Sequence, residues 1–402
     1  MRIYSPKRAF LKQNCPGSRK NPRILYVIGS LDVGGTEKQF YLLLKHLDRF
    51  RFDCRVVCLD EGGYWIERIR NLGIELVGLQ RKGSYDVNRL ASLALIIRRF
   101  RPDIVHSFQP HANVYAGLAT LITRTGRLIV SCRSYLPPER LQKPINRFLN
   151  RIIYGRADAV VCNCHALKRD LIKRFGNRVS ARVIFNGIEA PESFRLSKEA
   201  LRQAIGLVPN RPVVGTAGRL VPIKNQRLFI DIIARISRIR PDVQFMIIGD
   251  GPLKTSLQAY AVKRQVAHAV TFPGQLPDAQ QWFPMFDVFV LTTANGDAQG
   301  EGFPNVVMEA MMNRIACVVS KAGGTAELLP DREAGYLIDT PSSDTYARYI
   351  LSLLENATLR EEMGRRAGEI IMQKYSAWKM KTQYQTLYYS LLNDASVAGG
   401  ET

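Results

Sequence analysis

Two glutamates eight residues apart, Glu301 and Glu309, enclose the segment most able to bind a polar ligand. Pro304 between them is typical of a first helical turn, which predicts a helix that begins near it. Glu301 then precedes the helix and Glu309 lies two turns inside it, so the carboxylates reach opposite ends of a ligand. Unpaired N–H groups at the helix start bind phosphate. They belong to Gly302, Phe303, Asn305 and Val306. The order carboxylate, amides, carboxylate is typical of a strip that binds sugar, diphosphate and ribose.

Basic residues and glycines elsewhere indicate further phosphate contacts. Gly218 and Arg219 end a predicted strand, and Lys224 follows before the next helix. An arginine fork and a lysine point charge together suit a diphosphate, although two solvated basic residues on a loop give the same pattern. Gly34 and Gly35 lie between the first predicted strand and its helix, where a phosphate can approach the backbone. A tight turn is the alternative interpretation of that pair.

The elements that position these residues alternate between strand and helix along the chain. Short apolar runs rich in Val and Ile separate amphipathic stretches, which predicts an α/β fold with two doubly wound parallel sheets. Predicted strands of the first sheet are 23–29, 55–59, 75–79, 104–107, 127–131, 159–162 and 182–184. Those of the second sheet are 213–218, 244–249, 270–272, 288–291, 316–320 and 335–338. Ligands bind such sheets at the carboxyl ends of the strands, so a cleft between the sheets is expected.

A length of 402 residues favours two domains. The expected parts are a basic arm over 1–22, a Rossmann-like domain over 23–190, a linker over 191–210, a second such domain over 211–375 and a helix over 376–395 that crosses back. The arm holds six basic and no acidic residues, which is typical of a loose segment.

These motifs resemble those of the retaining GT-B glycosyltransferases of family four, the glycosyl transferases group 1. The resemblance covers about residues 23–393 and rests on the motifs above together with two more. These are Asn186-Gly187-Ile188 and Gly249-Asp250-Gly251-Pro252. It implies an N-terminal domain that binds the acceptor, a C-terminal domain that binds the sugar nucleotide, and a last helix that returns to the first domain.

The resemblance also implies roles for individual residues. Arg219 and Lys224 would neutralise the donor diphosphate, and Glu309 would accept hydrogen bonds from the ribose. Glu301 would bind the transferred sugar. Amides along Gly302, Phe303, Pro304, Asn305 and Val306 would hold phosphate and sugar, and Gly34 and Gly35 would approach the distal phosphate.

The resemblance to family four implies two further sites. The family places a cleft histidine after the fourth strand; His111 matches it and is expected to be catalytic, whereas His106 is expected in the core. Contacts to the base would come from the backbone near Gln275 and Leu276. The loop over 292–300 is longer than is usual in the family, so the resemblance does not indicate which sugar is transferred.

No Asp-x-Asp pair occurs in the sequence, so we expect no metal and no other cofactor. A zinc site at Cys162-x-Cys164-His165 is a weaker hypothesis, because no second cysteine pair accompanies it. Seven scattered cysteines and the lack of a long apolar run favour a cytoplasmic protein.

Charge is divided unequally along the chain. Residues 1–200 carry a net charge of +20 and residues 201–402 only +2. The segment 140–156 repeats basic residues at helical spacing, at Arg140, Lys143, Arg147 and Arg151. Either it is an ordinary core helix or it holds the first domain on the anionic inner face of the cytoplasmic membrane. The second interpretation fits a lipid-linked or oligosaccharide acceptor.

The expected activity is transfer of a hexose, from UDP-hexose in particular, to a glycan or lipid-linked acceptor in cell-surface polysaccharide synthesis. A sugar-nucleotide epimerase of the same architecture is the main alternative. A basic nucleic-acid-binding protein is weaker, since it leaves the two glutamates unexplained. A hydrolase acid–base pair is also weaker, because amides and basic residues surround the glutamates. A dinucleotide oxidoreductase lacks its Gly-x-Gly-x-x-Gly turn.

Overall fold

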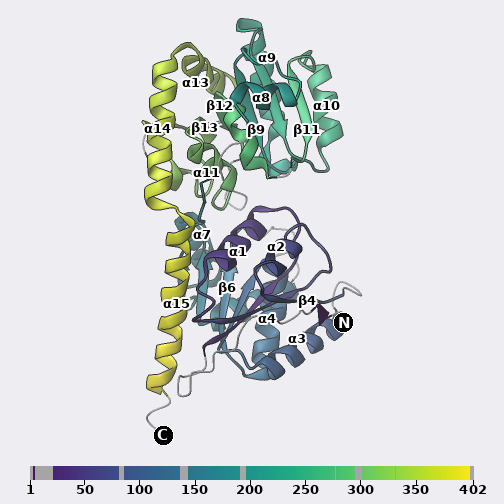
Figure 1. Ribbon diagram of the computed structural model, residues 1–402, viewed down its shortest axis with the longest axis vertical. Coiled ribbons are helices and arrows are strands. Elements are labelled where there is room, and N and C mark those ends of the chain that lie inside the picture. Colours follow the sequence, from purple (N-terminus) through teal and green to yellow (C-terminus); the bar gives the residue numbers. More distant parts are fainter. Residues whose placement is uncertain are drawn as a thin grey trace. The chain divides into compact units, whose positions relative to one another are not determined.

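The computed structural model describes residues 3–4, 21–80, 86–135, 144–190, 196–276, 278–294, 301–330 and 332–398. The chain divides into two compact units (Figure 1). Unit 1 comprises Met1–Gly187 with Ala377–Thr402, and unit 2 comprises Ile188–Ser376. Each unit is a sheet with helices on its faces, which confirms the predicted α/β class.

Unit 1 is built on a sheet of eight strands in the order β1-β4-β3-β2-β5-β6-β7-β8. The strands are β1 Ile3–Tyr4, β2 Arg23–Ile28, β3 Asp53–Cys58, β4 Glu75–Gly78, β5 Ile104–Phe108, β6 Arg127–Cys132, β7 Ala159–Cys162 and β8 Ala181–Val183. All pairs are parallel except β1 with β4. The strand order reverses between β2 and β5, which is where such sheets bind ligands.

Strand β1 differs from the expectation of a loose arm over 1–22. Ile3 and Tyr4 pair with Val77 and Leu76 and so extend the edge of the sheet. A two-residue strand carries too little periodicity to be predicted from sequence.

Helices α1 Gly35–His46, α2 Ile66–Arg70, α3 Val87–Phe100, α4 Pro110–Thr123, α6 Pro144–Arg156 and α7 His165–Phe175 surround this sheet. The last helix, α15 Ala377–Ala398, also belongs to unit 1 (Figure 1). Tyr384 and Tyr388 of α15 are fully buried in the core of unit 1. His106 lies 2.9 Å from the Tyr388 hydroxyl and 2.9 Å from Ser131 Oγ, and burial lowers its pKa well below the usual value. This histidine is therefore a neutral core residue, as predicted.

Unit 2 is built on six parallel strands in the order β11-β10-β9-β12-β13-β14. They are β9 Val213–Ala217, β10 Gln244–Ile248, β11 Val270–Gly274, β12 Val288–Leu291, β13 Ala316–Ser320 and β14 Tyr336–Ile338. Helices α8 Lys198–Ala204, α9 Gln226–Ile239, α10 Lys254–Lys263, α11 Asn305–Met312, α12 Thr325–Leu328, α13 Ser343–Glu355 and α14 Ala357–Lys374 accompany them. Short 3₁₀ helices η1 Pro222–Lys224 and η2 Ala279–Met285 complete the unit. Its strand order reverses between β9 and β12.

The segment expected as a linker, 191–210, belongs to unit 2. Within it α8 packs on η2, and the buried Arg202 donates to the Met285 carbonyl at 2.9 Å and to Asp287 at 2.6 Å. The structure does not describe 191–195. The chain passes between units at Gly187, whose N–H and C=O both pair with the Gln39 side chain at 2.8 Å.

Candidate functional site

Two of the residues expected to bind a donor, Lys224 and Glu301, come together where the strand order of unit 2 reverses. Lys224 follows β9 on η1, and Glu301 follows β12. Lys224 Nζ forms an ion pair with Glu301 Oε2, and the Thr293 hydroxyl donates to the same oxygen at 3.2 Å. The two charged side chains are largely buried, with exposed fractions of 18% and 15%. The site thus places one cation and one carboxylate in contact at the ligand-binding edge of the sheet.

Two threonines after β12, Thr292 and Thr293, fix the positions of Lys224 and Glu301 through hydrogen bonds. The Thr292 hydroxyl donates to the carbonyls of Lys224 and Asn225 at 3.1 and 3.0 Å. The Thr293 carbonyl accepts a hydrogen bond of 2.7 Å from Ser320 at the end of β13. Both threonines are buried. Sequence reasoning missed them, because a threonine after a strand is common and its partners are distant in sequence.

A second glycine pair, Gly323-Gly324, supports Glu301 and was also missed. The N–H of Gly324 donates to the carbonyls of Glu301 and Gly302, at 3.3 and 2.8 Å. Gly323 has φ +56°, and a Cβ there would overlap the Glu301 carbonyl oxygen. A glycine pair in the loop between a predicted strand and the next helix is the same signal that identified Gly34-Gly35, so the sequence did carry it.

We expect Gly323→Ala to disturb the position of Glu301. The methyl group would displace the Glu301 backbone, so turnover of a sugar nucleotide should fall at least about tenfold, the effect of losing ~1.4 kcal/mol of transition-state stabilisation. Gly206→Ala is the matched control, because Gly206 also has positive φ, +79°, but nothing lies within 4 Å of its Cβ position. Backbone strain should cost Gly206→Ala about 1–2 kcal/mol of stability, and Gly323→Ala should lose more because its methyl group also overlaps the Glu301 carbonyl; both losses are measured by denaturant unfolding. Equal activity of the two variants would show that Gly323 does not position Glu301.

The glycines of Gly249-Asp250-Gly251 allow the ends of β9 and β10 to pack backbone against backbone. Gly249 and Gly251 have φ of +140° and +156°, and a Cβ at either position would press on the backbone of Gly218 or Leu220. The Leu220 N–H donates to the Asp250 carbonyl at 3.0 Å. These contacts fix the turn that carries the exposed side chain of Arg219. The motif thus has a structural role beside Arg219.

The remaining expected donor contacts lie on neighbouring elements of unit 2. Gln275 and Leu276 directly follow β11, so they share the carboxyl edge of the sheet. Glu309 is on α11 and is 94% buried, with a relative exposure of 6%. A glutamate on a helix is usually exposed, but Glu309 is buried. Helix α11 begins at Asn305 with Pro304 as its N-cap, one residue later than a proline in the first turn would give.

In unit 1, Gly34 and Gly35 lie at the start of α1, with Gly34 as its N-cap. A Cβ at Gly34 would overlap the carboxylate of Glu37, which is 9% exposed. Gln109 Nε2 donates to this carboxylate at 2.5 Å, and Gln109 Oε1 accepts from the Ser30 N–H at 2.9 Å. The glutamine thus joins the loop after β2 to the start of α4.

Gln109 adopts φ +77° and ψ 147°, a backbone conformation that non-glycine residues rarely occupy. Side-chain contacts on both sides of it hold this strained geometry at the point where the strand order of unit 1 reverses. No residue-type signal predicts such a conformation for a glutamine, so sequence analysis missed it.

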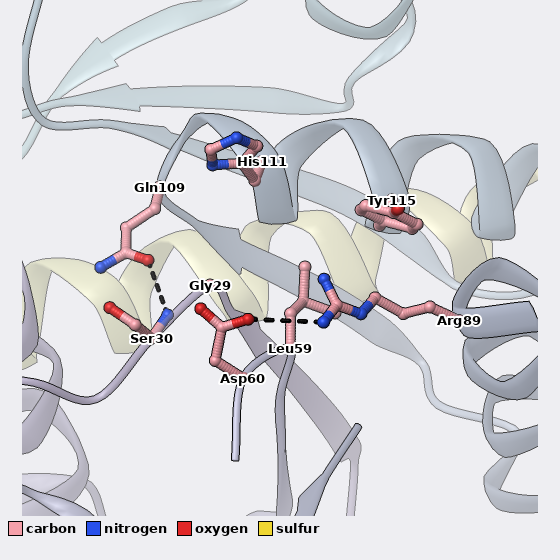
Figure 2. Close-up of a pocket in the computed structure, with 8 residues that line it drawn as sticks. All are labelled: Gly29, Ser30, Leu59, Asp60, Arg89, Gln109, His111 and Tyr115. Carbon is pink, nitrogen blue, oxygen red and sulfur yellow. Dashed lines mark hydrogen bonds and ion pairs between the residues drawn. The ribbon is translucent and has the colours of Figure 1, made fainter. Parts of the chain in front are cut away.

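His111 is exposed on the first turn of α4. It lines a pocket of about 110 Å³ together with Gly29, Ser30, Leu59, Asp60, Arg89, Gln109 and Tyr115. Figure 2 shows His111 and Tyr115 projecting from the same helix on one wall of this pocket. Gly34 and Gly35 are not among its lining residues.

Of the four basic residues expected to form a stripe, Arg140 and Lys143 lie outside the described residues. Arg147 and Arg151 are exposed on α6. Phe148, on the same helix, is 60% exposed. The buried face of α6 is made by Asn150, Ile153 and Tyr154.

Within the described residues the structure contains no group of three or more His, Cys, Asp or Glu side chains arranged to hold a metal ion. Cys162 and Cys164 are both buried and form no disulfide, and His165 is exposed. A hydrogen bond with the Cys132 thiol, together with burial, raises the pKa of Cys162 far above its usual value. None of the described helices has an apolar stretch long enough to span a bilayer.

Comparison with known structures assigns both units to one architecture. The chain matches HepE of Anabaena, crystallised with UDP and glucose, with a TM-score of 0.81 and 23% identity over 92% of this chain and 100% of that one. Such likenesses define a GT-B fold of two Rossmann-like domains.

Family models then place the chain more narrowly. The model for Glycosyltransferase Family 4 matches residues 33–191, and the model for Glycosyl transferases group 1 matches residues 197–369. The chain belongs to the group 1 glycosyltransferases and is a glycosyltransferase enzyme.

Two curated relatives illustrate the range of this family. N-acetyl-alpha-D-glucosaminyl L-malate synthase of Bacillus anthracis is 22% identical over 77% of this chain and 80% of its own length. The UDP-Gal:alpha-D-GlcNAc-diphosphoundecaprenol alpha-1,3-galactosyltransferase of Escherichia coli is 22% identical over 85% of this chain and 90% of its own. Their acceptors differ in kind, so family membership alone leaves the acceptor of this chain open.

Proposed function

We propose that the chain is a retaining, metal-independent glycosyltransferase that moves a hexose from UDP-hexose to a glycan or lipid-linked acceptor in cell-surface polysaccharide synthesis. The observation that carries the proposal is the contact of Lys224, Glu301 and Thr293 where β9 and β12 diverge. A cation for the diphosphate lies directly beside a carboxylate for sugar hydroxyls. A uridine donor is supported by the relatives, since HepE was crystallised with UDP and glucose and the E. coli enzyme is named for UDP-Gal.

The proposed chemistry uses charge and orientation. The bond between the anomeric carbon and the diphosphate oxygen breaks as the acceptor oxygen bonds to the same face of that carbon. The acceptor proton passes to the departing phosphate oxygen. Lys224 and Arg219 stabilise the charge that develops on this phosphate, and Glu301 orients the sugar through its hydroxyls. His111 of unit 1 remains a proposed catalytic residue.

The same arrangement supports the proposed metal independence. Two cationic side chains and the N–H groups at the start of α11 supply positive charge for a diphosphate. A thermal-shift panel of UDP, GDP, ADP and their sugars, repeated with EDTA, tests the proposal. We expect UDP and one UDP-hexose to give the largest shifts, unchanged by EDTA. A preference for GDP or ADP would correct the donor, and a shift that EDTA abolishes would contradict metal independence.

We also propose that unit 1 docks peripherally on anionic lipid at the cytoplasmic face of the membrane. Helix α6 exposes Ile145 and Phe148, by 51% and 60%, close in sequence to the exposed Arg147 and Arg151. Apolar side chains that enter the headgroup region beside arginines that bind phosphate are typical of an interfacial helix.

Liposome co-sedimentation tests this docking. Each basic residue near an anionic bilayer contributes about 1 kcal/mol, so replacing Arg147 and Arg151 by glutamine should weaken binding about thirtyfold at low salt. Phe148→Ser should weaken it further at any salt. The control removes the same charge from the end of α3, with Arg98→Gln and Arg99→Gln, which are also exposed. Equal losses in both arginine pairs would place the attraction in the net charge of unit 1 and not in α6.

A further inference from the structure

The pocket of unit 1 contains a buried cation, Arg89, that takes no part in the proposed transfer chemistry. Arg89, on the first turn of α3, reaches into this pocket from the side facing Asp60 (Figure 2). The pocket volume of about 110 Å³ is below the ~300–1,000 Å³ of sites that enclose whole small molecules. It therefore suits one functional group of a larger ligand.

The Arg89 side chain is deeply buried but weakly paired. Only 6% of it is exposed. Its Nη2 lies 3.4 Å from Asp60 Oδ1 and 3.5 Å from the Leu79 carbonyl, both at the outer limit of hydrogen bonding. Its Nε has no hydrogen-bond partner among the residues that the structure describes. Its Cζ lies 5.8 Å from the centroid of the Tyr115 ring, so among the described residues the guanidinium has one ring contact and two long polar contacts, and its Nε–H is unsatisfied.

A buried guanidinium without close partners is unfavourable, because the protein does not replace the hydration that the charge has lost. Asp60 offsets this cost only in part, since its carboxylate is 46% exposed and the contact is long. A ligand oxyanion would supply the missing close contacts, which for arginine are short and often bidentate.

The opposite wall is preformed and adds donors. Tyr115 is fixed because its hydroxyl accepts the Asp86 N–H at 3.0 Å, and Asp86 in turn caps α3 by accepting the Arg89 N–H at 3.1 Å. His111, one helical turn before Tyr115, lines the same wall (Figure 2). The cap, the tyrosine and the arginine therefore hold one another in place around the pocket.

We propose that this pocket binds an anionic group, a carboxylate or a phosphate, carried by the acceptor, with Arg89 as its main contact. The proposal rests on the proposed function, because the ligand is the acceptor of that transfer. Asp60 partly neutralises Arg89 when no anion is bound, and it repels the anion when one binds. Arg89 thereby selects charged acceptors over neutral ones.

Isothermal titration of the full chain with inorganic phosphate and with succinate tests this assignment, with UDP present at saturation to occupy unit 2. We expect at least one probe to bind, about tenfold more weakly in Arg89→Gln and more tightly in Asp60→Asn, since a charge-assisted contact is lost in the first and a competing carboxylate in the second. The relative response to the two probes distinguishes a phosphate from a carboxylate ligand. Arg174→Gln is the control, because Arg174 also pairs with an aspartate but lies outside the pocket.

The two substitutions are expected to have opposite effects, so the proposal can be tested even if Arg89→Gln fails to fold. Asp60 is half-exposed, so Asp60→Asn should fold and should bind the anion more tightly. Neither probe binding to the wild type, or Asp60→Asn binding no more tightly, would overturn the assignment. UDP binding in the same samples separates the two proposals. If UDP binds while both anions fail, only the pocket assignment is wrong; if UDP also fails, the proposed function is wrong.

Discussion

Lys224→Ala is expected to weaken the binding of a nucleoside diphosphate by about ten- to a hundredfold, because it removes a charge-assisted contact worth ~1.5–3 kcal/mol. Arg219→Ala should cost less, since Arg219 is exposed whereas Lys224 is largely buried. Both affinities are measured by isothermal titration with UDP. Arg235→Ala serves as the control, because Arg235 is paired with Asp344 on the exposed side of α9 and should have no effect.

Because Lys224 is paired with Glu301, the loss of UDP affinity in Lys224→Ala has two sources. Without the lysine, Glu301 is left largely buried and unpaired, so part of the loss arises from this uncompensated charge. The double variant Lys224→Ala with Glu301→Gln removes that part. It should remain weaker than the wild type for UDP. Full recovery of affinity in the double variant would mean that Lys224 serves to neutralise Glu301 and does not bind phosphate.

The second large effect separates the two glutamates. Glu301→Gln should reduce sugar transfer by about two orders of magnitude, as expected when an orienting contact of ~2.7 kcal/mol is lost. Its affinity for free UDP should not fall, and should rise, because Lys224 is released from its ion pair. Glu309→Gln should weaken UDP and UDP-sugar alike, because its proposed partner is the ribose.

These variants are compared by turnover of the UDP-sugar and by UDP affinity, with circular dichroism as the check on folding. Glu309 is deeply buried, so Glu309→Gln is chosen because it keeps the shape of the side chain. Loss of free UDP binding in Glu301→Gln, equal to that in Glu309→Gln, would refute the division of roles between sugar and ribose.

Much of this arrangement was predictable because its signals are local. Strands of parallel sheets are continuous apolar runs, so β2 to β14 follow from the sequence within a few residues. Since ligand sites lie at the carboxyl ends of such strands, the sequence pattern alone places Arg219, Lys224 and Glu301 near one another. The structure adds that Lys224 and Glu301 are paired.

What sequence analysis missed depends on contacts between distant segments. Thr293 and Gln109 act through partners on other elements, and neither residue type signals its role. Apolar residues on a helix usually face the core, whereas Phe148 of α6 is 60% exposed, which the residue type alone does not indicate. Buried Arg89 had no signal at all, since its weak pairing depends on Asp60 and the Leu79 carbonyl.

The proposed function requires unit 2 to bind a nucleoside-diphosphate sugar at the ends of β9 and β12. A crystal structure of the full chain with bound UDP tests it most directly, by the position of the diphosphate. We predict phosphate oxygens within hydrogen-bonding distance of Lys224 and Arg219, and the ribose hydroxyls on Glu309. A nucleotide bound elsewhere, or one whose phosphates contact neither basic residue, would show that this edge of the sheet is not the donor site.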